Sequence, residues 1–331
     1  MIKKSNKLKH LKNARIVLEA SCSVKKNEVV AILTHGARRG AGPNTSDARV
    51  LASVAAQIGA YPVIIDISEY ANMPSYKNGD GLESVRVALQ KADVVIGCFT
   101  DYKYLGLGKL QSADVYHTGE HRWMALQSHM DQWDITASEI ATISKRTAWL
   151  QEQLNNSQEI KVISEAGTDF TFSPMRYTPV LAIIPNYGEI AITPLQGSEN
   201  GIFIIDGPTQ MGVRPNNELD REPLRIIVES GIVKDYSGDI VQIERLSKFI
   251  NSKSPSACYI DEVGIPTTRV KANNMCWSDG THSTETIHIA IGNNKLRDDL
   301  IHGPLHMDGE IMNPTIIVDG KTILNNGNFV D

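Results

Sequence analysis

The stretch EVVAILTHGARRGAGPNTSDARVLASVAAQIGAYPVIIDI, residues 28–67, decides the fold of the first half of the chain. Residues 28–33 form a short apolar run that is typical of a buried strand, residues 48–60 have helical periodicity, and residues 61–67 form the next strand. GLESVRVALQKADVVIGCF, residues 81–99, repeats the order of helix and strand. This alternation of strand and helix predicts a parallel, doubly wound sheet.

The second half of the chain has a different texture. Residues 135–155 read as a long helix and connector, after which short strand-like segments are separated by turn residues. Only GDIVQIERLSKFINS, residues 238–252, reads as a clear helix there. We therefore predict an α/β, Rossmann-like domain over residues 1–155, followed by a strand-rich α+β domain over residues 156–331.

Composition excludes several classes of protein. The chain has 331 residues, of which 41% are hydrophobic and 21% charged, and its net charge of −5 gives no reason to expect nucleic acid or an anionic membrane as a partner. No apolar run approaches the ~20 residues that span a bilayer, and the basic N-terminus lacks the apolar core of a signal peptide. Four cysteines without a CxxC pair indicate a reducing compartment, so we expect a cytoplasmic protein.

Histidines gather near the end of the chain. Four of the nine lie within 25 residues, at positions 282, 288, 302 and 306. In LHMDGEIM, residues 305–312, His306 and Asp308 are two positions apart, so on a strand they share one face and lie about 6.5–7 Å apart at Cα. Imidazole and carboxylate are common ligands of zinc, iron, cobalt and manganese. The alternative is an exposed edge strand with solvated polar residues.

Three other strand-like segments carry an ionisable residue among apolar ones: in the first two it faces away from the isoleucines, and in the third it falls on the side of Ile260 and Gly264. These residues are His288 in TIHIAIG, Glu189 in YGEIAIT and Glu262 in ACYIDEVGI. Burial of a carboxylate on such a strand costs several kcal/mol unless a cation compensates it. Although a single strand glutamate is usually exposed, the repeated pattern favours a shared metal site.

These segments resemble the thermophilic metallo-aminopeptidase (aminopeptidase T-like) family, which also includes 2,5-dihydroxypyridine 5,6-dioxygenase. The resemblance covers nearly the whole chain, but it is specific in five segments of the second half: EAGTDFTFS (165–173), NYGEIAITP (186–194), YIDEVGI (259–265), TIHIAIG (286–292) and LHMDGEIM (305–312). It implies that the ligands of two divalent ions are Glu189, Glu262, His288, His306 and Asp308. It also implies a homodimer.

The chain departs from both branches of this family. The peptidases have a tyrosine shortly after the histidine motif, whereas GNNKLRDD, residues 292–299, has none. The dioxygenases hold one ferrous ion with two histidines and an aspartate; Glu262 stands where their first histidine would be, and they lack counterparts of Glu189 and His288. The carboxylates of Glu189 and Glu262 favour a two-metal hydrolase. The length of the chain, in contrast, is closer to that of the dioxygenase.

The sequence therefore predicts that the strand-rich α+β domain, residues 156–331, is a metal-binding and catalytic domain. The predicted function is a metal-dependent hydrolase that cleaves an amide bond in a short peptide or in a small cyclic or heterocyclic amide. Two ions of zinc, cobalt or manganese would activate the attacking water. Either Glu189 or Glu262 bridges the ions or accepts the proton. The alternative is a mononuclear Fe(II) dioxygenase that cleaves a hydroxylated pyridine-like ring, and a third hypothesis is a non-catalytic binding protein.

Three further residues are candidates outside the ligand set. His282 is an acid or a substrate contact, or else a solvated loop histidine. Asp169 shapes the substrate end of the site, or else caps a turn. Arg214 binds a substrate carboxylate, or else lies exposed on its loop.

Overall fold

The structure is a computed structural model of the chain. It describes residues 4–34, 45–67, 83–98, 122–126, 130, 135–180, 188–207, 222–251, 257–268, 285–292 and 306–330. Helices and several sheets are mixed along the chain, as in an α/β protein. The chain divides into two compact units, one of residues 1–142 and 181–186 and the other of residues 143–180 and 187–331. The domain boundary predicted at residue 155 remains a prediction.

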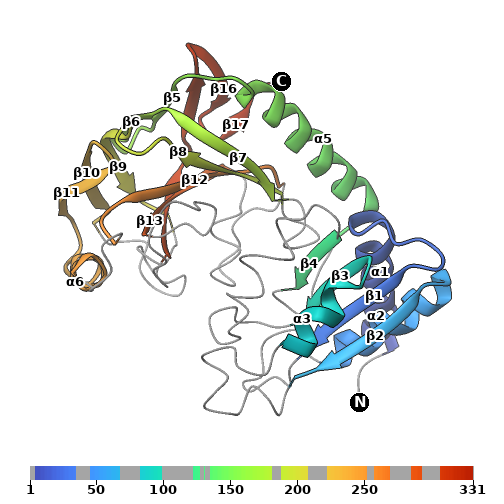
Figure 1. The fold of residues 1–331 in the computed structure, drawn as a ribbon. Helices are drawn as coiled ribbons and strands as arrows, with labels where there is room; N and C mark the ends of the chain where they lie inside the picture. Colours follow the sequence, from blue (N-terminus) through green and yellow to red (C-terminus); the bar gives the residue numbers. More distant parts are fainter. Residues whose placement is uncertain are drawn as a thin grey trace. The chain divides into compact units, whose positions relative to one another are not determined.

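The first unit contains a four-stranded sheet in the order β2-β1-β3-β4 (Figure 1). Its elements are α1 (Lys4–Ile16), a π-helical turn (Val17–Ser21), β1 (Val29–Thr34), α2 (Thr45–Ile58), β2 (Tyr61–Asp66), α3 (Glu83–Gln90), β3 (Val94–Cys98) and β4 (Arg122–Leu126). All three strand pairs are parallel, so the predicted parallel pairing is confirmed. Strands β1 and β3 are almost wholly buried because helices and neighbouring strands cover them, as expected of central parallel strands.

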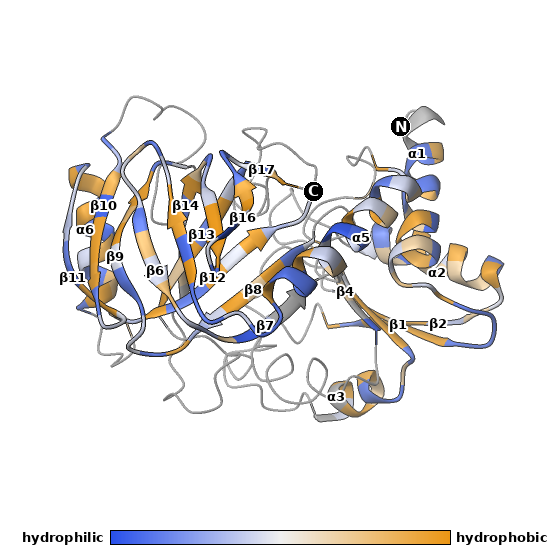
Figure 2. Ribbon diagram, turned by 90° about the horizontal axis from the view of Figure 1, so that it is seen from above, coloured by the Kyte–Doolittle hydropathy of each residue, from blue (hydrophilic) through white to orange (hydrophobic). Residues whose placement is uncertain are grey.

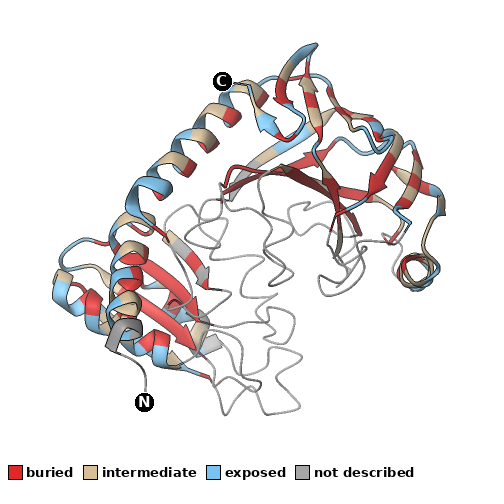
Figure 3. Ribbon diagram, turned by 180° about the vertical axis from the view of Figure 1, so that it is seen from behind, coloured by how far each residue is buried: buried red, intermediate tan, exposed pale blue. Residues whose placement is uncertain are grey.

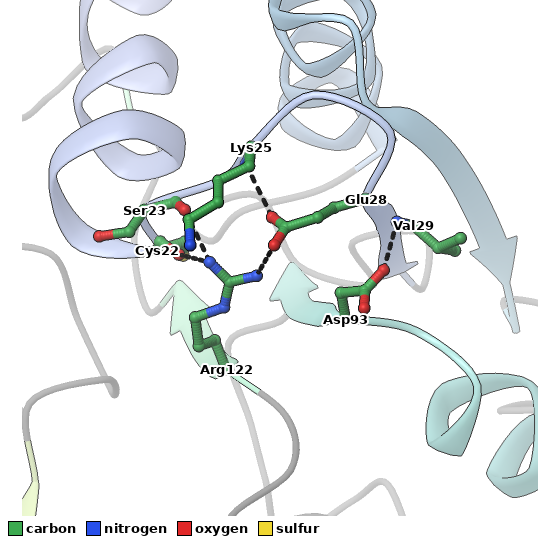
Figure 4. A network of polar contacts seen from close by, with 7 residues as sticks. All are labelled: Cys22, Ser23, Lys25, Glu28, Val29, Asp93 and Arg122. Atoms are coloured by element: carbon green, nitrogen blue, oxygen red, sulfur yellow. Dashed lines mark hydrogen bonds and ion pairs between the residues drawn. The ribbon is translucent and has the colours of Figure 1, made fainter.

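A polar network fastens the starts of the strands in this unit (Figure 4). The Arg122 guanidinium donates hydrogen bonds to the carbonyl oxygens of residues 22 and 23, at 3.0 and 2.6 Å, and pairs with Glu28 at 2.6 Å. The backbone N–H of Val29 donates to the Asp93 carboxylate at 2.8 Å. These contacts tie β1, β3 and β4 together at one end, and they indicate a structural role for Arg122.

The second unit is built on two antiparallel sheets. One has eight strands in the order β11-β10-β9-β6-β5-β15-β16-β17, and the other has five in the order β14-β13-β12-β8-β7. The elements are α5 (Ala137–Leu154, which begins before the unit), β5 (Ile160–Ile163), β6 (Asp169–Phe172), β7 (Pro174–Val180), β8 (Glu189–Pro194), β9 (Asn200–Ile205), β10 (Leu224–Glu229), β11 (Ile232–Ser237), α6 (Ile240–Ile250), β12 (Ile260–Pro266), β13 (Thr286–Gly292), β14 (His306–Met312), β15 (Thr315–Val318), β16 (Lys321–Asn325) and β17 (Asn328–Phe329).

Both sheets contribute to one hydrophobic core. The five-stranded sheet supplies aliphatic side chains and the eight-stranded sheet supplies three phenylalanines: Ile190, Ile192, Val263, Ile265, Ile287, Ile289, Ile291 and Ile311 from the first, and Phe170, Phe172 and Phe203 from the second. Apolar and polar residues alternate along these strands (Figure 2). Since alternate residues of a strand face opposite sides, the polar residues of the five-stranded sheet lie on the face away from the core.

Helix α5 supports one end of the five-stranded sheet. Its buried residues recur along one side of the helix (Figure 3). The hydroxyls of Thr147 and Thr267 are 2.6 Å apart, and Arg146 donates to the carbonyl oxygens of Thr267 and Thr268. A Cβ on Gly188 would lie 2.3 Å from a methyl carbon of Ile143, so the missing side chain lets α5 approach the start of β8. The helix therefore fixes the backbone next to Glu189.

Among the helices within the described ranges, none combines the length and the apolar character needed to span a bilayer.

Candidate metal centre

Three ionisable side chains from three neighbouring strands converge on the polar face of the five-stranded sheet. They are Glu189 on β8, Glu262 on β12 and His288 on β13, and one ligand atom of each lies within 4.8 Å of the others. His288 Nε2 is 3.5 Å from Oε1 of Glu189 and 3.6 Å from Oε1 of Glu262. Glu189 and His288 are each 3% exposed and Glu262 is partly buried, so the cluster is largely buried rather than a solvated acidic surface.

The register of the strands explains why these side chains meet. Glu189 lies opposite Pro266, and His288 lies opposite Gly264. Directly opposed residues of antiparallel strands share a face, and so do residues two apart on one strand. Glu262 is two residues from Gly264 on β12, so it points to the same side as His288 and Glu189. The register of the three strands thus brings the three ionisable side chains to one place on the sheet.

Gly264 is the position that lets the histidine reach the glutamate two strands away. A Cβ on Gly264 would lie 2.0 Å from Cε1 and 2.3 Å from Nε2 of His288, and 2.6 Å from Oε1 of Glu189. These distances are too short for any real side-chain carbon, so the imidazole occupies the space that every other residue type would fill. The imidazole thus lies over β12 and presents Nε2 to the carboxylate of β8.

The electrostatics of the cluster favour a cation. Burial by itself lowers the pKa of His288, but the nearby carboxylates of Glu189, Glu262 and Asp308 outweigh burial and raise that pKa to about 10. The site therefore retains a proton where a metal ion could bind instead. One imidazole nitrogen and two carboxylates that lie this close together would suit a divalent ion. The residues present fit a metal.

Strand β14 adds further groups beside this cluster. Asp308 lies opposite Ala290 of β13, which places it on the same face, and its side chain is half-buried. His306 begins β14, where its backbone pairs with Gly292, and its side chain lies outside the described residues. Of the five predicted ligands, the structure thus brings three together, places a fourth on their face and locates the backbone of the fifth.

Of the other predicted site residues, the structure describes Asp169, which lies away from this cluster. Asp169 lies on β6 of the eight-stranded sheet, next to the core residue Phe170, and forms an exposed ion pair with Lys161 at 2.8 Å. Its side chain therefore lies on the outer face of the other sheet, on the opposite side of the core from the metal cluster. His282 and Arg214 lie outside the described residues.

Sequence reasoning missed one residue of the polar face. Glu310 lies directly opposite His288 and is fully buried. Burial raises the pKa of its carboxyl group well above the usual range, although the charge of His288 and a hydrogen bond from Thr286 act in the opposite direction. Alternation along the strand places Glu310 on the same face as His306 and Asp308, but its position opposite His288 depends on the register of β13 and β14.

The raised pKa of His288 predicts how metal-free protein responds to pH. Protonated His288 stabilises the fold fully below its unfolded pKa of 6.5, and this contribution is lost as the pH rises through about 10. We expect the free energy of unfolding, measured by urea denaturation in the presence of a chelator, to fall between these pH values. His288→Gln should remove most of this fall. An equal pH dependence in both proteins would contradict the assignment of the raised pKa to His288.

Comparison with known proteins agrees with the family inferred from the sequence motifs. The family model of NicX, 2,5-dihydroxypyridine 5,6-dioxygenase, matches residues 11–331. No curated protein sequence matches the chain. The structure is similar to that of a 2,5-dihydroxypyridine dioxygenase from Pseudomonas putida KT2440, with a TM-score of 0.71 and 16% sequence identity over 97% of this chain and 96% of that one.

A second solved structure, wild-type AmpT from Thermus thermophilus, is also similar. Its TM-score is 0.62, with 14% identity over 98% of this chain and 100% of that one. At such identities the two structures establish a shared fold only. The match to the family model is what assigns the chain to a family. The chain belongs to the 2,5-dihydroxypyridine 5,6-dioxygenase (NicX) family, within the aminopeptidase T-like group to which its motifs pointed.

Proposed function

We propose that the protein is a metal-dependent enzyme that uses dioxygen to cleave a hydroxylated pyridine-like ring. The observation that carries the proposal is a buried cluster of metal-ligand type, Glu189, Glu262 and His288, in a chain that the family model of a ring-cleaving dioxygenase matches over residues 11–331. This reverses the order of the two enzyme functions predicted from the sequence, because the family match favours the dioxygenase over the hydrolase.

The residues of the polar face define what the chain itself contributes. His288 Nε2 and the carboxylates of Glu189 and Glu262 would hold a divalent ion, and by family resemblance His306 and Asp308 would complete its ligands. A bound ferrous ion would supply Lewis acidity and redox chemistry toward dioxygen. A carboxylate that does not bind the ion could accept the proton that the ring hydroxyl loses on binding. Burial of the cluster limits the access of bulk water.

The second candidate is a hydrolase of an amide bond. The observation that favours it is that Glu189 and His288 are present and meet Glu262, whereas the resemblance gives the dioxygenases no counterpart of these two residues. By the same resemblance the peptidases use such a set to hold two ions. Under this hypothesis the cluster would bind zinc, cobalt or manganese, and one of its glutamates would accept a proton from water.

The test begins with metal analysis of protein purified without added ions or chelators. The dioxygenase proposal expects about one iron per chain and oxygen uptake with 2,5-dihydroxypyridine or a related ring after anaerobic loading with Fe(II). It also expects no turnover in the absence of oxygen. Amide hydrolysis without oxygen and about two ions per chain would support the second candidate instead. Protein that binds no metal under any of these conditions would contradict both candidates and favour a binding protein.

The family resemblance also leads us to expect a homodimer that acts on a small molecule. Light scattering of the purified protein would test the oligomeric state, and a monomer at micromolar concentration would contradict it.

A further inference from the structure

Glu310 is a buried carboxylate whose place next to the metal cluster has no role in the function proposed above. It lies on β14, directly opposite His288 on β13, and it is fully buried. Opposed residues of antiparallel strands have Cβ atoms about 4.5–5.5 Å apart and pack against each other. The Glu310 side chain is therefore the neighbour of His288 on the side of β14.

Several contacts hold Glu310 in one place. A Cβ on Gly207 would lie 2.6 Å from Cβ and 2.8 Å from Oε2 of Glu310, so the chain at residue 207 passes close over this side chain. The backbone N–H groups of Asp206 and Gly207 donate to the carbonyl oxygen of Glu310 at 3.2 and 3.1 Å. Glu310 is thus enclosed and has little freedom to move away from His288.

The two strands that flank His288 offer it opposite environments. On the β12 side, Gly264 has no side chain, and Cε1 and Nε2 of the imidazole occupy the space over it. On the β14 side, Glu310 fills the corresponding place with a full-length side chain. An imidazole between these neighbours has room only toward β12, and in that direction its Nε2 comes within 3.5 Å of Glu189.

We propose that Glu310 is a positioning residue of the metal centre, whose bulk on the β14 side keeps the His288 imidazole over Gly264 and directed at Glu189 and Glu262. The inference rests on the proposed metal function, because it assigns Glu310 an effect on the ion through His288. It depends on the shape of the side chain. A side chain of similar size should therefore preserve the effect, and truncation should remove it.

The experiment compares cobalt(II) binding by the full chain and its variants, measured by competition with a chromophoric chelator and by the visible absorption of bound cobalt. Glu310→Ala is expected to weaken cobalt binding about 10–100-fold, as loss of a residue that orients a ligand typically does. Glu310→Gln, which keeps the shape, should stay within about twofold of the unmodified protein, with the same absorption bands. Asp169→Ala, an exposed truncation on the other sheet, is the control and should leave binding unchanged.

Three results would each contradict either the positioning role of Glu310 or the proposed metal function. Unchanged affinity in Glu310→Ala would show that the side chain does not position His288. An equal loss in Glu310→Gln would show that charge rather than shape matters, which also overturns the inference. Failure of the unmodified protein to bind cobalt would instead contradict the metal function itself. If Glu310→Ala does not fold, Glu310→Met takes its place: retained binding supports the steric role, and lost binding overturns it.

Discussion

Replacement of His288 by alanine is expected to abolish tight binding of a divalent ion and, with it, the ring cleavage proposed above. His288 supplies the nitrogen of the cluster, 3.5 and 3.6 Å from oxygens of Glu189 and Glu262. Without it, the ion would lose a ligand outright, so the affinity should fall by more than the roughly 100-fold that loss of an outer-shell partner can cause. Metal content after gel filtration and the Kd for cobalt(II) would measure the loss, and oxygen uptake would measure activity.

The matched control for this substitution is His10→Ala in the other unit. His10 pairs with Asp47 at 2.9 Å, so its removal also breaks a contact between a histidine and a buried carboxylate. We expect it to affect stability while leaving the metal content unchanged. If His288→Ala retained a full complement of metal, His288 would not be a ligand and the proposed centre would have to be abandoned.

Gly264→Ala should have the second largest effect, although it adds only one methyl group. The added carbon would lie 2.0 Å from Cε1 of His288 and 2.6 Å from Oε1 of Glu189, so at least one of these side chains must move. Because both belong to the proposed ligand set, we expect the affinity for cobalt(II) to fall at least about tenfold. Overpacking of this kind should also cost about 1–3 kcal/mol of folding stability, measured by urea denaturation.

Gly320→Ala separates the two effects of the Gly264 substitution. Gly320 has a positive φ of 81° and no atom within 4 Å of an added Cβ, so alanine there strains the backbone without meeting a neighbour. It should lower stability and leave metal binding intact. Unimpaired metal binding in Gly264→Ala would mean that the imidazole has another place from which to reach the ion.

The sequence predicted which strand face several candidate ligands would occupy. Alternation along a strand depends only on local geometry, so Glu189 and His288 could be assigned to the side away from the isoleucines from the residues alone. Alternation puts Glu262 on the side of Ile260 and Gly264, whereas in the structure a register shift between Ile260 and Glu262 leaves Ile260 in the core. Which strands are neighbours and in which register they pair depends on contacts between distant segments. For that reason Glu310, the cross-strand neighbour of His288, was overlooked.

Asp169 is a second residue whose position could not be predicted from alternation along its strand. It also lies on an alternating strand next to a conspicuous turn, yet β6 belongs to the eight-stranded sheet, and Asp169 lies on that sheet's outer face. Sequence periodicity gives a residue's side of a strand but does not say to which sheet the strand belongs. The parallel sheet of the first unit was easier to predict because short strand–helix–strand connections leave few alternatives. Its fourth strand, β4, is only five residues long and was not predicted.

The path of the chain over Glu310 and Met312 has a consequence for aggregation. The outermost strand of a sheet can recruit strands from other molecules through its unpaired backbone groups. On β14, the carbonyl oxygen of Glu310 already accepts bonds from residues 206 and 207, and the N–H of Met312 donates to the Asp206 carboxylate at 2.8 Å. A foreign strand would have to displace these internal bonds, so the Glu310–Met312 end of β14 is protected against templated assembly into fibrils.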